Sequence, residues 1–536
     1  MTAFDKVASD RTRGLGIMLG VTGRIQRRSA VIWALVLGAS MGGTAASVAA
    51  LYDTPAKIHT YAQAVTTGSA LVAINGKVEG IDSLGGVIQD EFGFMAAFLL
   101  PLLGIGLVAR ATRKEEESGR LELLLGGRIA RHQPTLAALV VATVTILATG
   151  VLFAVGLMLS GVQPAGSVLY ALSLCTLAFV FAGLAALVAQ LTLHARGVYL
   201  WSLIVLAASY VLRGVGDATR TWVTWLSPLG WAEKVAPFGH QRWWVLGIPL
   251  VVGFALAGAA LRLAGGRDLG SALVRGGAGP ERASARLRGP IGLAVWIHRS
   301  GTLGWLTGGV MLAATMGALS QQLLDAMAGN PALAEALGVG KTRPLAGFVS
   351  VTQLYLAVIA TGYVVQAIGA LRAEESEGRL EARLSGTLSR ARWLASHTLV
   401  VLGGLLTIVL GSSLVLAFAT ALAVGDLAEL GPTVGSGLAY LPAELVLAGL
   451  ALAISGIRPR LFWIAWAGYA ASTFVAFLGA GLNLPRWVVD LSPTTHVGNP
   501  PAGATQTGGL VVMAGIALSL SIIGFVAFRR RDIPQG

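Results

Sequence analysis

Long uncharged stretches dominate the pattern of apolar and polar positions along the chain. A charged side chain at the centre of a bilayer costs at least about 2.5 kcal/mol, so an uncharged run of roughly 20 residues predicts a membrane-spanning helix. The run 135–195 is long enough for two helices, with a break from Ser160 to Pro164. The spans predicted in this way are 29–51, 92–109, two within 135–195, 197–212, 243–261, 300–324, 345–371, 393–425, 430–457, 461–485 and 507–528. We therefore expect an all-α polytopic membrane protein with about twelve transmembrane helices.

The composition agrees with a chain whose main solvent is lipid. Of its 536 residues, 55% are hydrophobic and 12% are charged, whereas charged residues make up about 25% of an average soluble protein. The high apolar content excludes intrinsic disorder, and the single cysteine excludes a disulfide-rich secreted scaffold. Too few residues are left outside the spans for a large soluble catalytic domain.

The distribution of basic residues predicts the orientation of the chain. If the N-terminus is cytoplasmic and the spans alternate, 30 of the 39 lysines and arginines lie on the cytoplasmic side. This is the positive-inside pattern, and with an even number of spans it places both termini in the cytoplasm. The net charge of +13 then faces anionic membrane lipid, and nucleic acid is not needed as a partner.

An acidic segment occurs twice. Residues 113–122 read RKEEESGRLE and residues 372–381 read RAEESEGRLE; extended to the first acidic segment (113–131) and the second acidic segment (372–390), ten of nineteen positions are identical. Each copy follows the second predicted span of its half, so the duplication is parallel. We expect two six-helix halves forming a pseudo-dimer, with boundaries at 1–264 for the first half, 265–299 for a basic connecting segment and 300–536 for the second half.

Each acidic segment has the pattern of an amphipathic helix, with an apolar residue every four positions on one stripe. In the first copy the spacing predicts an i,i+4 ion pair between Glu116 and Arg120, and the matching pair in the repeat is Glu375 with Arg379. A plain connecting helix would have this pattern too, but retention of the same acids, glycine and arginine in both copies favours a functional role. The residues expected to act there are Glu115, Glu116, Gly119, Arg120, Glu122, Glu374, Glu375, Gly378, Arg379 and Glu381.

This motif, Glu-Glu-x-x-Gly-Arg-Leu-Glu, resembles that of membrane permeases in the type-two branch of ATP-binding cassette exporters, in particular the fused actinobacterial permeases of polyketide-antibiotic exporters. The resemblance covers essentially the whole chain. It implies that each acidic segment is a coupling helix that docks on a separate ATPase subunit, a homodimer that holds ATP and Mg²⁺. Segments 20–28 and 289–298 are similar to the elbow helices of that family. The excess of 33 arginines over six lysines also suits an actinobacterium, and the expected location is the bacterial cell (inner) membrane.

The second copy departs from the first at two positions. Ser376 stands where the first copy has Glu117, and Arg383 stands where it has Leu124. We expect from this that the two docking faces are not equivalent.

The resemblance implies a permease that exports amphiphilic or hydrophobic compounds, such as antibiotics and drugs, by alternating access along a central pathway. Lipid is an alternative cargo for the same class of exporter. A proton-coupled secondary transporter also fits two parallel six-helix halves, although several ionisable residues would then be expected inside the spans. A membrane-embedded enzyme would need clustered acids or histidines at a membrane boundary, which the sequence does not have, and an assembly scaffold is a further alternative. We expect no enzymatic activity in this chain.

Candidate substrate contacts are few. Glu444 is the acid that falls inside a predicted span, where it would meet a cationic group of the cargo, relay a proton or have a structural role. Polar residues recur in the span 345–371, where they line a cavity or form hydrogen bonds between helices. They are Gln353, Tyr355, Tyr363 and Gln366.

Cofactor chemistry is not expected in this chain. The segment Gly338 to Thr342 looks like the end of a phosphate-binding loop, but position 335, where that loop needs glycine, is Glu335. The seven histidines have no metal-ligand spacing. ATP hydrolysis is therefore assigned to a partner.

Overall fold

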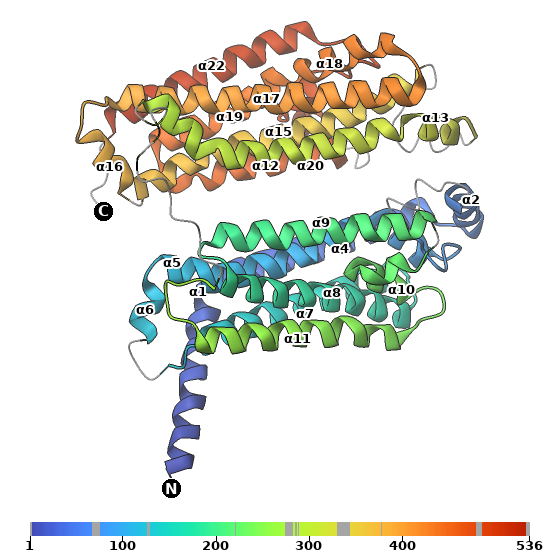
Figure 1. The fold of residues 1–536 in the computed structure, drawn as a ribbon. Coiled ribbons are helices and arrows are strands. Elements are labelled where there is room, and N and C mark those ends of the chain that lie inside the picture. The colour runs from blue at the N-terminus through green and yellow to red at the C-terminus, as the bar shows by residue number, and fades with distance from the viewer. Residues whose placement is uncertain are drawn as a thin grey trace. The chain divides into compact units, whose positions relative to one another are not determined.

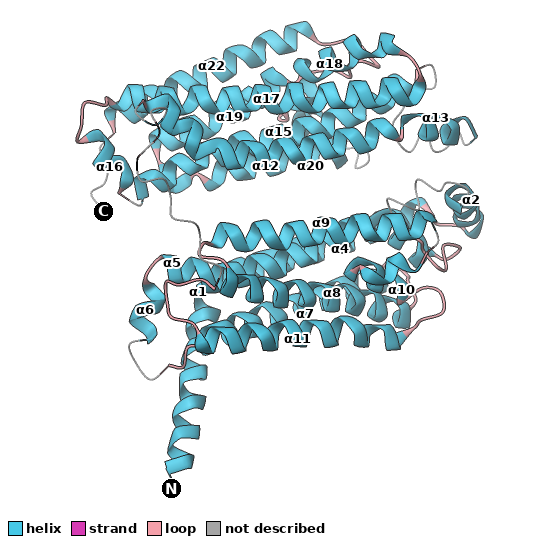
Figure 2. Ribbon diagram, in the orientation of Figure 1, coloured by secondary structure: helices cyan, strands magenta, loops and turns pink. Residues whose placement is uncertain are grey.

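The computed structural model describes residues 3–66, 76–125, 129–219, 221–273, 282, 284, 287, 289–329, 343–376, 378–478 and 485–531. These residues form helices joined by turns and loops, with one isolated antiparallel bridge between Gly498 and Thr505 (Figure 2). The chain divides into two compact units, Met1–Gly279 and Pro280–Gly536. The boundary between the units falls inside the segment predicted to connect two halves.

The first unit is built around α8. Its helices are α1 (Ala3–Leu51), α2 (Pro55–Thr66), α4 (Leu84–Ala109), the π-helix η1 (Arg110–Lys114), α5 (Glu115–Glu117), α6 (Arg120–Leu125), α7 (Gln133–Leu159), α8 (Pro164–Leu191), α9 (Ala195–Thr219), η2 (Trp222–Leu226), α10 (Pro228–Lys234), η3 (Trp243–Leu246) and α11 (Gly247–Gly266) (Figure 1). Helix α8 packs against α4, α7 and α11, and α1 packs along α7.

The second unit has a matching set of helix pairs. Its helices are α12 (Pro290–Ala318), α13 (Ser320–Gly329), α15 (Pro344–Ser376), α16 (Arg379–Leu384), α17 (Arg390–Val424), η5 (Leu427–Glu429), α18 (Leu430–Ala439), α19 (Leu441–Ile457), η6 (Pro459–Leu461), α20 (Trp463–Leu478), α21 (Arg486–Val489), η7 (Pro493–His496) and α22 (Thr507–Arg530). Helix α12 packs along α17, and α19 packs against α15 and α22.

Small residues bring the most closely packed helices together. A Cβ on Gly156 of α7 would lie 2.7 Å from the Cα of Gly42 in α1, and a Cβ on Gly456 of α19 would lie 2.3 Å from the carbonyl oxygen of Gly524 in α22. Backbones in lipid approach this closely where side chains are minimal, because dispersion contacts and not water exclusion hold membrane helices together.

Ten helical stretches in the described part of the chain are long and apolar enough to cross a membrane. The first unit contributes six of them, each overlapping a predicted span. The predicted span 300–324 falls on α12 and the start of α13, and the described part of the predicted span 461–485 falls largely on α20. These helices are not among the ten. Large apolar side chains on these stretches are exposed, as expected where lipid replaces water. Examples are Val144, Val251, Leu422 and Val511.

Three segments differ in detail from the simple pattern of one helix per predicted span. Helices α1 and α12 run unbroken through 20–28 and 290–298, the segments that resemble elbow helices. The predicted span 430–457 lies within the candidate span Leu427–Ile457, in which α18 and α19 meet at Tyr440, because Pro442 in the first turn of α19 has no N–H to continue α18. The acidic segments need a correction, which is described below.

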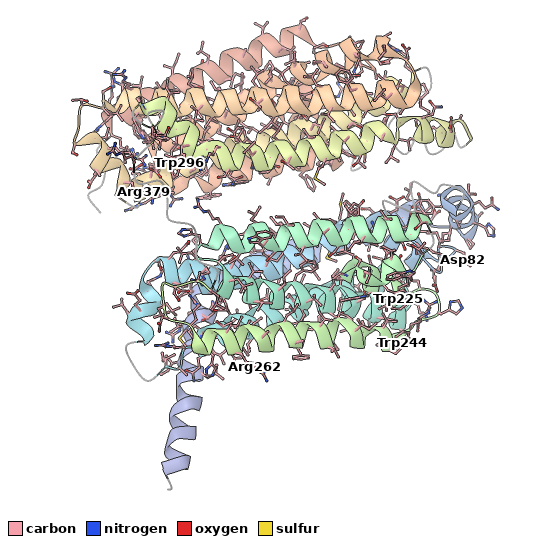
Figure 3. All side chains as sticks on the ribbon, in the orientation of Figure 1. Asp82, Trp225, Trp244, Arg262, Trp296 and Arg379 are labelled. Atoms are coloured by element: carbon pink, nitrogen blue, oxygen red, sulfur yellow. The ribbon has the colours of Figure 1, made fainter. Side chains whose placement is uncertain are left out.

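Aromatic and basic side chains mark the ends of α11. Trp244 stacks on Trp225 with ring centroids 6.1 Å apart just before the helix begins, and Arg262 lies near its other end (Figure 3). Tryptophan and arginine are typical of the two membrane–water boundaries.

Candidate functional site: the two acidic segments

Each acidic segment bends at its glycine and is not one continuous helix. In the first unit the helix that begins at α4 continues through η1 and α5 to Glu117, turns at Gly119 and resumes as α6. In the second unit α15 ends at Ser376, and α16 begins after Gly378. The φ angles of Gly119 and Gly378 are +72° and +70°. Glycine alone adopts this left-handed conformation without steric cost, which is why both copies carry it at this position.

The bend changes which residues form ion pairs. Arg120 donates to Glu115 through Nε and Nη2, at 2.8 and 2.9 Å, and Arg379 donates through Nε to Glu374 at 2.9 Å. The predicted i,i+4 pairs of Glu116 with Arg120 and of Glu375 with Arg379 are therefore wrong. A left-handed residue between the partners replaces the four-residue helical spacing with a five-residue one.

Glu116 instead joins the first acidic segment to the end of α11. Arg267, the residue directly after α11, donates from Nη1 and Nη2 to the two carboxylate oxygens of Glu116 at 2.9 and 2.8 Å, and the Gly270 N–H donates to the same carboxylate at 2.8 Å. The buried Arg113 lies 3.2 Å from Glu116 and also donates to the Ala189 carbonyl at the end of α8. Glu116 thus ties three helix ends together.

The second unit repeats this connection. Arg531, the residue directly after α22, donates from Nη2 to Glu375 at 2.8 Å. The last arginine of each acidic segment binds the backbone of the same linking arginine. Arg131 donates to the Arg267 carbonyl at 3.4 Å, and Arg390 donates to the Arg531 carbonyl at 2.7 Å. Neither link was predicted from the sequence. The available signal was an arginine a few residues after the last predicted span of each half.

Two acids of the motif stay on the surface. Glu122 and Glu381 are exposed and form no ion pair with any residue that the structure describes. The leucines that precede them, Leu121 and Leu380, are buried, as the apolar stripe predicts. Leu123 is 85% exposed. Each short helix is therefore anchored on one side and presents a carboxylate on the other.

The two acidic segments differ in their surroundings. Glu117 accepts a hydrogen bond from the Ala195 N–H at the start of α9 and lies 3.0 Å from His194, whereas the second copy has Ser376 at this position. Arg383 adds a second cation to Glu374 at 2.6 Å, where the first copy has Leu124. The sequence differences therefore change the contacts of the segments.

The four polar residues of α15 lie in separate interhelical contacts. Buried Gln353 donates from Nε2 to the Thr433 carbonyl of α18 at 2.8 Å. Buried Tyr363 lies 3.0 Å from the hydroxyl of Thr302 in α12. Tyr355 and Gln366 are exposed; the Tyr355 ring contacts Phe477 edge-on, and Gln366 accepts a hydrogen bond from Trp305.

Glu444 is buried in the first turn of α19, with 2% of its surface exposed. Neither carboxylate oxygen has a hydrogen-bond partner among the described residues. Apolar side chains from α15, α18 and α22 form the cluster beside it. The positive end of the α19 dipole is the nearest compensation for a charge here.

Comparison with known proteins identifies the family. The model of the family described as "Multidrug efflux system permease Rv1217c, C-terminal domain" matches residues 15–263 and 287–529. The chain is 32% identical over 514 residues to the multidrug efflux system permease protein Rv1217c of Mycobacterium tuberculosis, a match that covers 95% of this chain and 93% of that protein. The chain belongs to this multidrug efflux permease family. It is a multi-pass membrane transport protein.

This permease also contains a buried charged cluster that sequence analysis missed, at the end of the first unit away from the acidic segment. Arg213 of α9 donates to Glu233 of α10 at 2.6 Å, and buried Asp90 of α4 accepts from the Tyr61 hydroxyl at 2.7 Å. Burial raises the pKa of Glu233 well above its ordinary value. The signal available was the group of charged residues between the uncharged predicted spans 197–212 and 243–261.

The structure shows no further candidate for a nucleotide or metal site among the residues that it describes. The segment from Gly338 to Thr342 lies outside the described residues. Within the described ranges no group of three histidine, cysteine or acidic side chains could hold a metal ion.

Proposed function

We propose that this permease is the transmembrane subunit of an ATP-driven exporter, with two parallel six-helix halves and ATP hydrolysed on a separate ATPase. The observation that carries the proposal is the repeated bend with its paired acids. In the first copy Glu116 pairs with Arg267, the residue directly after α11, and in the second copy Glu375 pairs with Arg531, the residue directly after α22.

These ion pairs provide a route by which a movement of the partner ATPase is transmitted to the membrane helices. A force on α6 acts on the helix that begins at α4 through the Glu115–Arg120 pair, and Glu116 transfers the displacement to α11. The buried anchor Leu121 packs α6 against α1 and α7. Buried, charge-assisted pairs are stiff because breaking them leaves an uncompensated charge. The second and sixth helices of each half therefore move together, which alternating access between two halves requires.

The exposed acids are the proposed docking points. Glu122 with Leu123 in α6, and Glu381 in α16, present a carboxylate on a short anchored helix. A partner ATPase would contact them with basic and apolar side chains. ATP and Mg²⁺ then belong to the partner, and the chain itself performs no hydrolysis.

The proposed cargo is an amphiphilic or hydrophobic compound, such as an antibiotic or drug. The printed function of the mycobacterial relative, multidrug efflux, supports this cargo, as does the sparse charge of the long helices. A lipid is the alternative cargo. The proposed location is the bacterial cell membrane, with both termini in the cytoplasm.

A proton-coupled secondary transporter is the second candidate. It is favoured by buried ionisable groups, namely Glu444, which the sequence already placed inside a span, and the cluster around Arg213 and Glu233, which was not predicted. Most of the cluster is internally paired, however, and Glu444 lies in the other unit.

Co-purification with candidate ATPases tests the proposal. The full-length chain is expressed with each candidate subunit, as wild type and with Glu122→Lys plus Glu381→Lys. The variant is expected to lose the ATPase while keeping its helical content. Glu429→Lys is the matched control, because Glu429 is a partly exposed acid that lies beyond the far end of α17. An ATPase retained by the double variant, or efflux abolished by an uncoupler alone, contradicts the proposal.

A further inference from the structure

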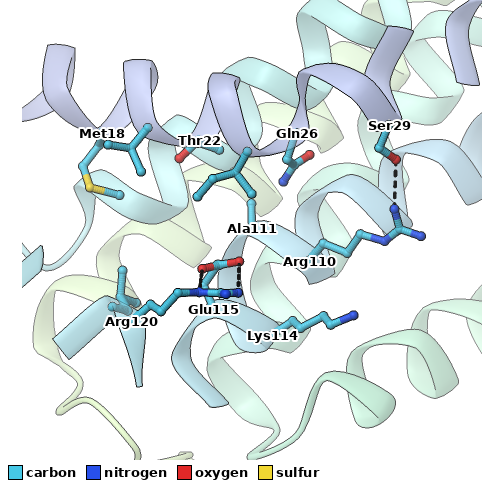
Figure 4. A pocket seen from close by; sticks show the side chains of 12 residues that line it. Met18, Thr22, Gln26, Ser29, Arg110, Ala111, Lys114, Glu115 and Arg120 are labelled. Carbon is cyan, nitrogen blue, oxygen red and sulfur yellow. Dashed lines mark hydrogen bonds and ion pairs between the residues drawn. The ribbon is translucent and has the colours of Figure 1, made fainter. Parts of the chain in front are cut away.

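A groove of about 250 Å³ opens between α1 and the first acidic segment (Figure 4). One wall is α1 between Met18 and Ser29, and the other comes from η1 and α6. Its apolar lining includes Met18, Val21, Ile25, Ala111 and Leu121.

Basic side chains predominate at the rim of the groove. Arg110 is exposed and donates to the Ser29 hydroxyl at 2.9 Å, and Lys114 is exposed and forms no ion pair with any described residue (Figure 4). Glu115 is the carboxylate in the lining, and Arg120 neutralises it. The exposed Arg28 adds another positive charge one residue before Ser29. The groove therefore attracts an anion.

A buried hydrogen-bond acceptor also lines the groove. Gln26 is 5% exposed; its Nε2 donates to the Leu107 carbonyl at 3.0 Å, and its Oε1 has no partner among the described residues. A buried acceptor without a partner costs free energy, so a ligand that supplies an O–H or N–H group is favoured there.

The groove lies where two long apolar helices become polar. The uncharged run of α1 begins at Ser29, and that of α4 ends at Ala109, directly before Arg110. Phospholipid phosphates lie at this depth, with apolar chains on one side and water on the other. A small soluble anion would make no favourable contact with the apolar lining.

We propose that this groove binds the headgroup of an anionic phospholipid that carries a headgroup hydroxyl, of the phosphatidylglycerol class. The phosphate lies between Arg110 and Lys114, the hydroxyl donates to Gln26 Oε1, and the glycerol and upper acyl chain contact the apolar lining. The bound lipid joins α1 to the first acidic segment. This proposal does not depend on the partner ATPase.

In the second unit the buried polar side chain near the start of α12 is His298, and it has a partner within the protein. His298 Nε2 lies 3.1 Å from His397 Nδ1. Arg299, at the opening of the predicted span 300–324, is exposed and lies over the Trp296 ring at 5.2 Å. Arg299→Gln is therefore a matched control for general attraction between arginine and anionic lipid.

Native mass spectrometry of the delipidated full chain, titrated with phosphatidylglycerol, phosphatidic acid and phosphatidylcholine, tests the site. Wild type is expected to bind phosphatidylglycerol first. Arg110→Gln with Lys114→Gln removes two charge-assisted contacts and is expected to weaken that binding about tenfold or more. Gln26→Leu is expected to abolish the preference for phosphatidylglycerol over phosphatidic acid, which lacks the headgroup hydroxyl. Arg299→Gln is expected to change neither.

Three results would overturn the proposal. They are equal binding of phosphatidylcholine, an unchanged affinity in the Arg110 and Lys114 double variant, and displacement of the lipid by inorganic phosphate, which would show an anion site without a lipid. Circular dichroism and size-exclusion profiles that match the wild type show that each variant is folded.

Discussion

Glu116 and Arg267 are joined by two charge-assisted hydrogen bonds of 2.9 and 2.8 Å across 151 residues of sequence. The first residue lies in the last turn of the long helix that begins at α4, and the second follows α11 directly. Both side chains are less than a tenth exposed. Glu375 and Arg531 hold the same positions in the second unit, so one connection between helix ends is built twice.

Breaking this connection is predicted to destabilise the first unit. Arg267→Gln leaves Glu116 buried with its main cation removed, which costs about 3 kcal/mol of unfolding free energy. Denaturant unfolding in detergent, followed by circular dichroism, measures the loss. Arg131→Gln is the control, because the Arg131–Asp268 pair nearby is mostly exposed and is expected to contribute less than about 1 kcal/mol. Equal losses for the two variants would contradict this prediction.

Replacing the glycine at either bend with alanine is predicted to cost only the free energy of backbone strain. Gly119→Ala and Gly378→Ala each force a side chain into the left-handed region, at a cost of about 1 kcal/mol. A Cβ at either position meets no atom within 4 Å, so no clash adds to this cost. Gly386→Ala is the control, because Gly386 is exposed and has no positive φ. The same unfolding measurement checks the difference, and a loss above about 3 kcal/mol would show that the strain account is incomplete.

The helices themselves were predictable, because lipid imposes a simple rule on span composition. The runs from 135 to 195 and from 243 to 261 became α7, α8 and α11 with ends shifted by a few residues. The exposed Leu123 and buried Leu121 likewise follow the apolar stripe. These features depend on local sequence alone.

The ion pairs could not be predicted from local spacing. An isolated glycine inside a helical pattern is compatible with a continuous helix, and nothing nearby signals that Gly119 turns left-handed. Because Gly119 is left-handed, Arg120 pairs with Glu115, and Glu116 pairs with Arg267 instead. A contact between residues so distant in sequence depends on how α4 and α11 pack against α8.

Glu444 is predicted to reduce stability in the absence of cargo. Its buried carboxylate has no hydrogen-bond partner among the described residues, so Glu444→Leu is expected to be neutral or to raise the unfolding free energy by about 1 kcal/mol. Efflux of cationic dyes is expected to fall in the same variant while efflux of neutral dyes persists. Destabilisation by more than about 2 kcal/mol would instead show that Glu444 is paired. Leu445→Ala, at a partly buried neighbour, serves as the control for general packing.

Acid sensitivity is predicted for the contact of Glu79 with the loop after α10. Burial raises the pKa of Glu79, but hydrogen bonds from His240 and Arg242 outweigh it and hold the pKa below its ordinary value of 4.5. A carboxylate with a depressed folded-state pKa stabilises the fold above its unfolded pKa and loses this contribution as the pH falls through the folded value. Glu79→Gln is therefore expected to lower stability at neutral pH and to match the wild type once the pH is well below 4.5. A difference that persists at low pH would contradict the assignment.

Transport in reconstituted vesicles tests the central claim most directly. The purified chain is reconstituted with and without the ATPase subunit proposed above, and accumulation of a fluorescent amphiphile is followed on addition of ATP and Mg²⁺. We predict accumulation when both proteins and ATP are present, and its loss with Glu122→Lys plus Glu381→Lys but not with Glu429→Lys. Accumulation in vesicles that hold this chain alone, driven by a proton gradient and unaffected by the double variant, would contradict the account.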